Sequence, residues 1–154
     1  MNIGIDSMTL EFILRIFVSL LLGALVGLER EMTGKPAGLR THIFVSMGAC
    51  LFTISSFYLT GSMSVDSSRI AAGIVTGIGF IGAGSIIATH GRVRGLTTAA
   101  SLWIVSAIGL MVGLGNYILS TLSAVLVFIV LRLGKIEREV EDETGKTSKR
   151  DERI

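Results

Sequence analysis

The sequence predicts an all-α, polytopic membrane protein of five transmembrane helices, and three observations lead to that prediction. Half of the 154 residues are hydrophobic, only 17% are charged, and the mean hydropathy is +0.70. No acidic residue occurs between Asp66 and Glu137. The apolar residues form continuous runs of about 17–25 residues, the length that crosses about 30 Å of hydrocarbon. A soluble domain of this size needs a more highly charged surface than this composition supplies.

Five apolar runs are separated by short polar or glycine-bearing links. They cover residues 10–28, 40–59, 70–88, 97–115 and 117–134. The runs are continuous rather than alternating, which favours helices, because a helix satisfies its own backbone hydrogen bonds in lipid. We therefore expect a transmembrane domain over residues 1–135. Residues 136–154 are expected to form a charged cytoplasmic tail, a short helix to about Glu143 and then a disordered end.

Glycines spaced four apart predict close helix packing through small residues. The spacing occurs at Gly23 and Gly27, at Gly73 and Gly77, and at Gly109 and Gly113. Such faces also make a homo-oligomer plausible.

The third run contains the pattern GxGxxG. In nucleotide-binding proteins this pattern is a turn from strand to helix, followed about 20 residues later by an acid. That context is absent, so we interpret the glycines of this run as helix-packing residues. They are Gly73, Gly77, Gly79, Gly82 and Gly84. An alternative is that the tract 79–84 breaks the third helix and exposes backbone that could coordinate an ion.

The basic residues predict the orientation. They concentrate in the first and third links and after the last run, and the positive-inside rule makes these segments cytoplasmic and the N-terminus external. The formal net charge of +2 is thus a signal of orientation. It does not indicate a nucleic-acid partner.

The first link carries the densest group of charges, which we interpret as a charge network. Its members are Glu29, Arg30, Glu31, Arg40 and His42. Acidic residues at the C-terminal end of a helix oppose its macrodipole, so a nearby cation should compensate them. We predict that Glu29 or Glu31 pairs with Arg40 across the link. The alternative is that these residues are interfacial anchors that face lipid headgroups.

The third link combines Arg92 and Arg94 with Thr97 and Thr98. Either threonine is predicted to cap the fourth helix by accepting from its free N–H groups. A helix N-terminus beside two arginines could bind an anion, such as a lipid phosphate or a partner's carboxylate. The simpler interpretation is a tight basic turn that anchors the topology.

The outer side carries few charges. Asp66 and Arg69 lie in the second link, and Asp66 is expected to act as an acid at the start of the third helix. Mg²⁺ prefers oxygen ligands, usually including one or two carboxylates. The candidates for a metal site are Glu29, Glu31 and Asp66, and the predicted topology puts Asp66 on the opposite side from the other two.

Catalysis is not predicted. The chain lacks a Ser/His/Asp arrangement, a phosphate-binding loop and any metal-spaced set of histidines and cysteines. No cofactor is therefore expected.

Three ordered motifs resemble the MgtC/SapB (YhiD-like) family of bacterial membrane proteins. They are GLERE at 27–31 with GLRTH at 38–42, RIAAG at 69–73 leading into GIGFIGAG at 77–84, and VRGLTTAASLW at 93–103. The resemblance covers about residues 10–135. It implies a multi-pass protein of the inner membrane with five helices and an external N-terminus.

The resemblance also implies a function: a noncatalytic regulator linked to growth under Mg²⁺ limitation, to virulence, and to restraint of ATP synthase. Its expected partners are membrane lipids, another membrane protein such as ATP synthase, and further copies of itself. The alternative is a component of a transporter or channel for Mg²⁺ or another ion. Two departures from the family are expected: a charged tail in place of an ACT-like domain after the last helix, and Ser67 where proline usually follows the acid.

Overall fold

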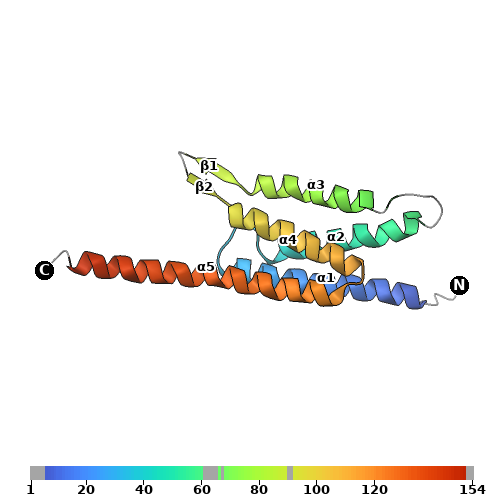
Figure 1. Ribbon diagram of the computed structural model, residues 1–154, viewed down its shortest axis with the longest axis horizontal. Coiled ribbons are helices and arrows are strands. Elements are labelled where there is room, and N and C mark those ends of the chain that lie inside the picture. The colour runs from blue at the N-terminus through green and yellow to red at the C-terminus, as the bar shows by residue number, and fades with distance from the viewer. Residues whose placement is uncertain (1–5, 61–65, 67, 90–91, 152–154) are drawn as a thin grey trace.

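The computed structural model describes residues 6–60, 66, 68–89 and 92–151. Within this part of the chain the fold consists of five helices and one two-stranded hairpin (Figure 1). The helices are α1 (Ser7–Met32), α2 (Leu39–Thr60), α3 (Ser68–Gly84), α4 (Leu96–Gly113) and α5 (Tyr117–Asp151), and the strands are β1 (Ile87–Thr89) and β2 (Arg92–Arg94). The prediction of an all-α protein with five helices is confirmed.

Three helices are long and apolar enough to cross a membrane. They are Ser7–Met32, Leu96–Gly113 and the first part of α5, Tyr117–Gly134, while α3 is a shorter apolar helix. The predicted orientation of these helices across the membrane stays a prediction.

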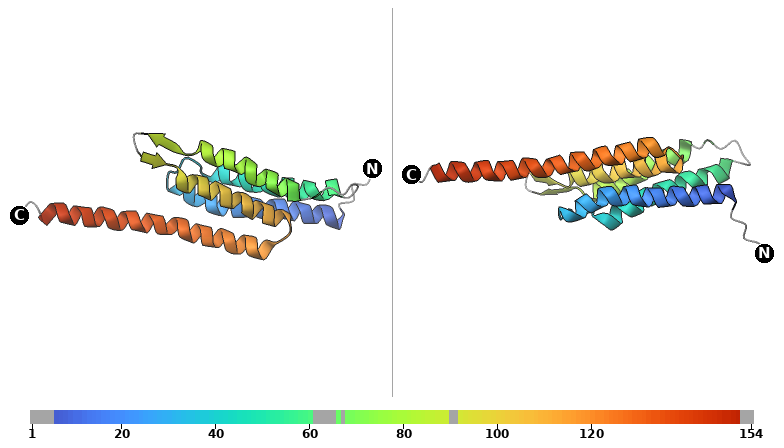
Figure 2. Two further views of the ribbon diagram at one scale, coloured as in Figure 1. Left: turned by 45° about the horizontal axis from the view of Figure 1, so that its top comes forward. Right: turned by 90° about the horizontal axis from the view of Figure 1, so that it is seen from below.

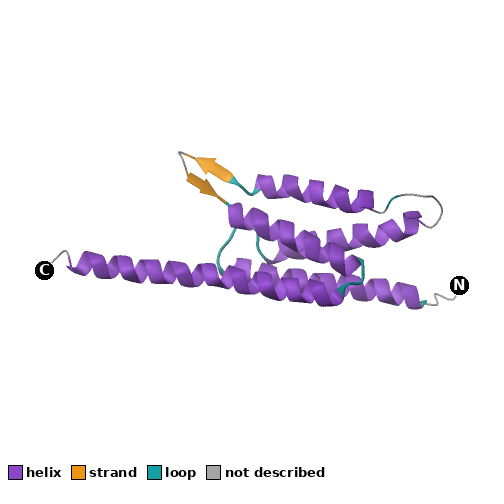
Figure 3. Ribbon diagram, in the orientation of Figure 1, coloured by secondary structure: helices purple, strands orange, loops and turns teal. Residues whose placement is uncertain are grey.

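Helix α4 lies at the centre of the bundle and contacts all four other helices. Helices α1, α2 and α4 pack together as a three-helix core, with α5 against α1 and α4 (Figure 2). Helix α3 packs mainly on α4 and more lightly on α2. The link between α1 and α2, the hairpin and the start of α4 lie at one end of the bundle, here called the hairpin end (Figure 3).

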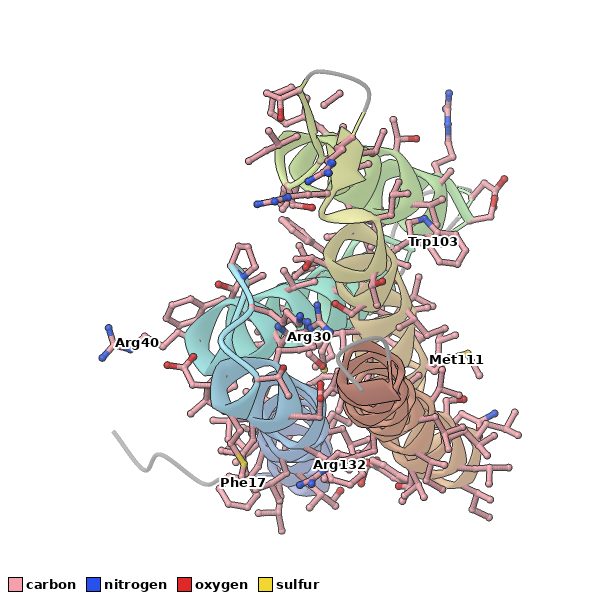
Figure 4. The ribbon with its side chains drawn as sticks, turned by 90° about the vertical axis from the view of Figure 1, so that its left-hand side faces the viewer. Phe17, Arg30, Arg40, Trp103, Met111 and Arg132 are labelled. Atoms are coloured by element: carbon pink, nitrogen blue, oxygen red, sulfur yellow. The ribbon has the colours of Figure 1, made fainter. Side chains whose placement is uncertain are left out.

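The distribution of polar and apolar side chains differs from that of a soluble protein. Large apolar side chains face outward, including Phe17 at 58% exposure and Phe80 at 84%. Figure 4 shows Phe17 and Trp103 directed away from the bundle. The interior holds many hydroxyl and charged side chains beside its apolar core: Ser19, Glu29, Arg30, His42, Ser46, Thr53, Ser56, Thr98, Ser101, Ser106 and Ser120 are buried. Such a surface suits hydrocarbon, where apolar exposure carries no penalty.

Four glycines bring α1 and α4 close to α2. A Cβ atom added at Gly27 would lie 2.9 Å from Leu39 Cα, and one at Gly23 would lie 2.9 Å from the carbonyl oxygen of His42. Gly109 lies against the backbone of Ser46, and Gly113 lies against Thr53 and the carbonyl of Cys50. These two pairs have the close-packing role that their four-residue spacing predicted.

The end of α3 differs from the prediction that the third run is helical to residue 88. The helix ends at Gly84, where Ser85 N–H bonds to the carbonyl of Gly82, and an antiparallel hairpin follows with Ile87 opposite Arg94. The β-branched residues after Gly84 favour strand. The alternative of a break within 79–84 does not hold either, because α3 is helical throughout that tract.

The last helix, α5, runs from Tyr117 to Asp151 and includes most of the charged segment after residue 135. The sequence predicted a short helix to about Glu143. The division of the chain into a membrane domain and a cytoplasmic tail remains a prediction.

Candidate functional site

A cluster of buried polar side chains lies between α1, α2 and α4 near the hairpin end, and we call it the polar cluster. Its members are Glu29, Arg30, His42, Thr98 and Ser101, each no more than 3% exposed. Figure 4 shows Arg30 in the middle of the bundle. Because each charge buried away from water carries a desolvation penalty of several kcal/mol, such groups persist only where partners satisfy them.

The chain positions the cluster through the short link between α1 and α2. Gly27 allows the start of α2 to approach α1, as described above. Glu31 Oε2 accepts a hydrogen bond of 3.0 Å from the N–H of Leu39, which caps the first turn of α2. This carboxylate lies against Gly38, where any side chain would overlap it. The cap and the glycines together place His42 one turn into α2, facing α4.

Arg30 joins α1 to α4. Its Nη2 donates a hydrogen bond of 2.9 Å to Thr98 Oγ1, and its Nη1 lies 4.0 Å from Glu29 Oε2. The carboxylate and guanidinium are both buried, so their opposite charges compensate each other in a region of low dielectric constant.

His42 joins α2 to α4. Its Nδ1 lies 2.9 Å from the carbonyl oxygen of Gly38, and its Nε2 lies 3.0 Å from Ser101 Oγ. A carbonyl oxygen only accepts, so Nδ1 carries a proton. If the ring is neutral, its Nε2 accepts a hydrogen bond from the hydroxyl of Ser101. If the ring is protonated, Nε2 donates to Ser101 Oγ, and the Ser101 hydroxyl donates to the carbonyl of Thr98, 2.8 Å away. Either arrangement satisfies both ring nitrogens.

Two buried oxygen atoms have no hydrogen-bond partner among the described residues. They are Glu29 Oε2 and Ser46 Oγ. A carboxylate oxygen without a hydrogen bond is chemically suited to accept a donor or a cation. Glu29 Oε2 is thus within ion-pair distance of Arg30 and accepts no hydrogen bond from the described residues.

The predicted ion pair between Arg40 and Glu29 or Glu31 is wrong. Among the described residues Glu29 is paired with Arg30, and Arg40 makes no ion pair with either glutamate. Glu29 faces the interior, Glu31 caps α2, and Arg40 extends away from the bundle (Figure 4). The compensation of Glu29 comes instead from its neighbour in the chain.

The predicted cap of α4 is also wrong. Gly95, at a φ of 91°, is the N-cap residue, and no side chain makes the cap bond. A left-handed φ is easily adopted by glycine. Thr97 is exposed, whereas Thr98 is turned inward to accept from Arg30. Arg92 and Arg94 are exposed on β2.

The two residues predicted for the outer side lie at the end of the bundle opposite the hairpin. Asp66 Oδ1 accepts from the N–H of Ser68 at 2.9 Å, and its carbonyl accepts from Arg69, so Asp66 caps α3 as expected. Hydrogen bonding to Ser68 holds the pKa of the Asp66 carboxyl below its usual range. Arg69 is exposed.

The glycines of α3 differ from one another in their surroundings. A Cβ atom on Gly82 would lie 3.6 Å from that of Ala99 on α4. The other four meet no atom of another element within 4 Å: Gly73, Gly77, Gly79 and Gly84. Their packing role stays a prediction. These four glycines could pack only against another molecule, because no other described element of this chain comes that close to them.

The three candidate metal ligands are not brought together. Glu29 is in the polar cluster, Glu31 caps α2, and Asp66 caps α3 at the far end. Over residues 6–60, 66, 68–89 and 92–151, no three histidine, cysteine or acidic side chains are placed to share a metal ion.

A second polar group, at the far end, was not identified from the sequence. Arg15 bonds to Glu11 Oε1 at 3.2 Å and donates to the carbonyl of Gly113 at 2.7 Å, and Tyr117 donates to Glu11 at 2.6 Å. Arg15 thereby joins α1 to the C-terminal end of α4, where a cation is favoured. The available signal was the four-residue spacing of Glu11 and Arg15 within an otherwise apolar run.

Ser101→Ala should destabilise the protein by about 1–3 kcal/mol, because it leaves Nε2 of the buried His42 without a partner. Thermal unfolding of the purified protein in detergent measures this loss. Ser55→Ala is the matched control, because Ser55 is exposed and its hydroxyl bonds only to the backbone of its own helix. Equal melting temperatures for the two variants would contradict the proposed link between α2 and α4.

Comparison with known proteins gives consistent matches. A profile of the MgtC family matches residues 16–139. YhiD of Escherichia coli (strain K12) is 44% identical over 132 residues, which cover 82% of this chain and 61% of YhiD. Protein MgtC of Salmonella typhimurium (strain LT2) is 49% identical over 107 residues, 69% of this chain and 45% of that protein.

A third relative, protein MgtC of Brucella abortus (strain 2308), is 44% identical over 110 residues, 71% of this chain and 44% of that protein. The chain therefore spans between 44% and 61% of the length of these relatives. No solved structure matches the chain.

Proposed function

The chain belongs to the MgtC family, and we propose that it is a noncatalytic regulator in the bacterial inner membrane that acts under Mg²⁺ limitation. The family and its relatives support a Mg²⁺-related membrane function. In this proposal the polar cluster holds α1, α2 and α4 in one arrangement. The exposed arginines of β2 then contact another membrane protein, and ATP synthase is the partner that the family resemblance suggests.

One observation carries the proposal: the buried charges are compensated within the chain, while the charges at the hairpin end are exposed. Glu29 has Arg30 beside it, and Arg30 also bonds to Thr98. Arg92 and Arg94 lie two residues apart on β2, so their side chains lie on the same face of the hairpin, and both are exposed. A pair of exposed arginines is suited to an acidic patch on a partner.

The runner-up is transport of Mg²⁺ or another ion, and it also has a specific observation in its favour. Glu29 Oε2 is buried without a hydrogen-bond partner among the described residues. The name of the Escherichia coli relative links that protein to magnesium transport. Against transport, the carboxylates at the two ends of the bundle are not joined by further acidic side chains in the spans.

Flux measurements separate the two functions. Purified protein in liposomes that contain a Mg²⁺-sensitive dye should give no Mg²⁺ entry above protein-free liposomes. In cells, the chain should restore growth at low Mg²⁺ to a strain that lacks its own relative. Arg92→Gln with Arg94→Gln should abolish that growth without lowering the melting temperature. Mg²⁺ entry that is lost in Glu29→Gln would overturn the regulator proposal and establish transport.

A further inference from the structure

A groove of about 850 Å³ lies between α2 and α3. Its walls are almost entirely apolar. Residues along its length include Phe44, Gly48 and Phe52 on α2 and Gly73 and Gly77 on α3, with Arg40 at the hairpin end. The groove exists because α3 rests mainly on α4 and only lightly on α2.

Glycines make the groove hollow. A Cβ atom added at Gly48, Gly73 or Gly77 would meet no atom of another element within 4 Å. These residues therefore do not bring helices of this chain together, in contrast to Gly23, Gly27, Gly109 and Gly113. Their lack of side chains leaves room for an occupant that comes from outside the chain.

The polar end of the groove is positively charged. Arg40 lies in the first turn of α2, is exposed, and extends away from the polar cluster (Figure 4). Over the described residues its side chain makes no ion pair. Thr41 lines the groove beside it. An arginine at the mouth of an apolar groove matches a ligand with an anionic head and an apolar tail, because a guanidinium binds phosphate through paired hydrogen bonds.

The dimensions of the groove favour a lipid over a helix. The twelve steps from Arg40 to Phe52 rise about 18 Å along α2, close to the roughly 15 Å that one leaflet contributes to the hydrocarbon layer. A membrane-spanning helix would follow the whole of the roughly 30 Å hydrocarbon layer, which is longer than the groove. The volume is within the range of about 300–1,000 Å³ that is usual for small-molecule sites.

We propose that the groove between α2 and α3 is a binding site for an anionic phospholipid, with the phosphate at Arg40 and an acyl chain over Gly48, Gly73 and Gly77. The ligand belongs to the leaflet at the hairpin end. This site is separate from the polar cluster and from the arginines of β2, so it does not depend on the regulatory function proposed above.

The test is lipid binding by the full chain, purified in an uncharged detergent and followed by native mass spectrometry. The probes are phosphatidylglycerol and phosphatidylcholine with the same acyl chains, with inorganic phosphate as a competitor. The wild type should bind phosphatidylglycerol about fivefold more tightly than phosphatidylcholine, the preference expected from one arginine near an anionic headgroup. Inorganic phosphate should not compete, because the acyl chain supplies most of the binding.

Variants assign the preference to the groove. Arg40→Gln should remove it and Arg40→Lys should retain most of it. Arg132→Gln is the matched control, because Arg132 is also exposed but lies on α5, away from Arg40 (Figure 4). This variant should bind both lipids as the wild type does. Gly77→Leu fills open space and should weaken binding of both lipids without lowering the melting temperature.

Three results would overturn the proposal. The first is an unchanged preference for phosphatidylglycerol in Arg40→Gln. The second is unchanged lipid binding in Gly77→Leu. The third is a dimer of the wild type that Gly77→Leu dissociates, because a second copy of the chain would then occupy the groove.

Discussion

Arg30→Met is expected to destabilise the folded protein by about 3–5 kcal/mol, the cost of removing one partner of a buried ion pair. The substitution keeps much of the side-chain volume but leaves the carboxylate of Glu29, which is 2% exposed, without a compensating charge. It also removes the hydrogen bond of 2.9 Å from Arg30 to Thr98, the direct side-chain link between α1 and α4 in the cluster. Chemical unfolding in detergent, followed by circular dichroism, measures the loss.

Two further variants show whether the loss comes from the uncompensated charge. Adding Glu29→Gln to Arg30→Met should recover part of the stability, because a neutral amide is cheaper to bury than an unpaired carboxylate. Arg40→Met is the matched control: it removes an arginine that is exposed and should change the stability by less than about 0.5 kcal/mol. A double variant no more stable than Arg30→Met alone would refute the electrostatic explanation.

Gly109→Ala is expected to have the second large effect. The new Cβ atom would meet the backbone of Ser46, with the carbonyl carbon 2.8 Å and Cα 2.9 Å away. Backbone atoms in the middle of a helix cannot rotate aside, so α2 and α4 must separate. Overpacking of this kind costs about 1–3 kcal/mol and sometimes more. The separation would also disturb the bond between His42 and Ser101, which depends on the same two helices.

The matched control is Gly77→Ala on α3. The added methyl group meets no atom of another element within 4 Å, and alanine is the better helix former by about 0.5–1 kcal/mol. The melting temperature should therefore fall in Gly109→Ala and stay constant or rise slightly in Gly77→Ala. Equal effects of the two substitutions would show that helix propensity, and not the approach of α2 to α4, determines the outcome.

The five helices were predictable because their signal is long and additive. An apolar run of about 20 residues has few conformations other than a helix open to it in a membrane. The hairpin was not predictable in the same way, because residues 85–94 are a short mixture of β-branched, basic and glycine residues with no periodicity long enough to read. The apolar run in the sequence continues through Ile86 and Ile87, and only the strand pairing shows that α3 has already ended.

The members of the polar cluster on α1 and α2, together with Thr98, were identified from the sequence, but their partners were not. Consecutive helical residues point about 100° apart, so Glu29, Arg30 and Glu31 face three different directions. Only the rotation of α1 in the bundle decides which of them meets α4. Ser101 carried no signal of its own, because a serine within an apolar span is common, and its role depends on lying opposite His42.

The early end of α3 has a consequence for the surrounding bilayer. Seventeen residues rise about 25 Å, some 5 Å less than the usual thickness of the hydrocarbon layer. Helix α2 beside it has 22 residues, so the lipids on the α3 side must compress or tilt to cover the ends of α3, at a cost of a fraction of a kcal/mol per Å. A change in membrane thickness therefore affects the α3 side of this protein more than the rest. A thinner bilayer matches the length of α3 better and favours its packing on α4.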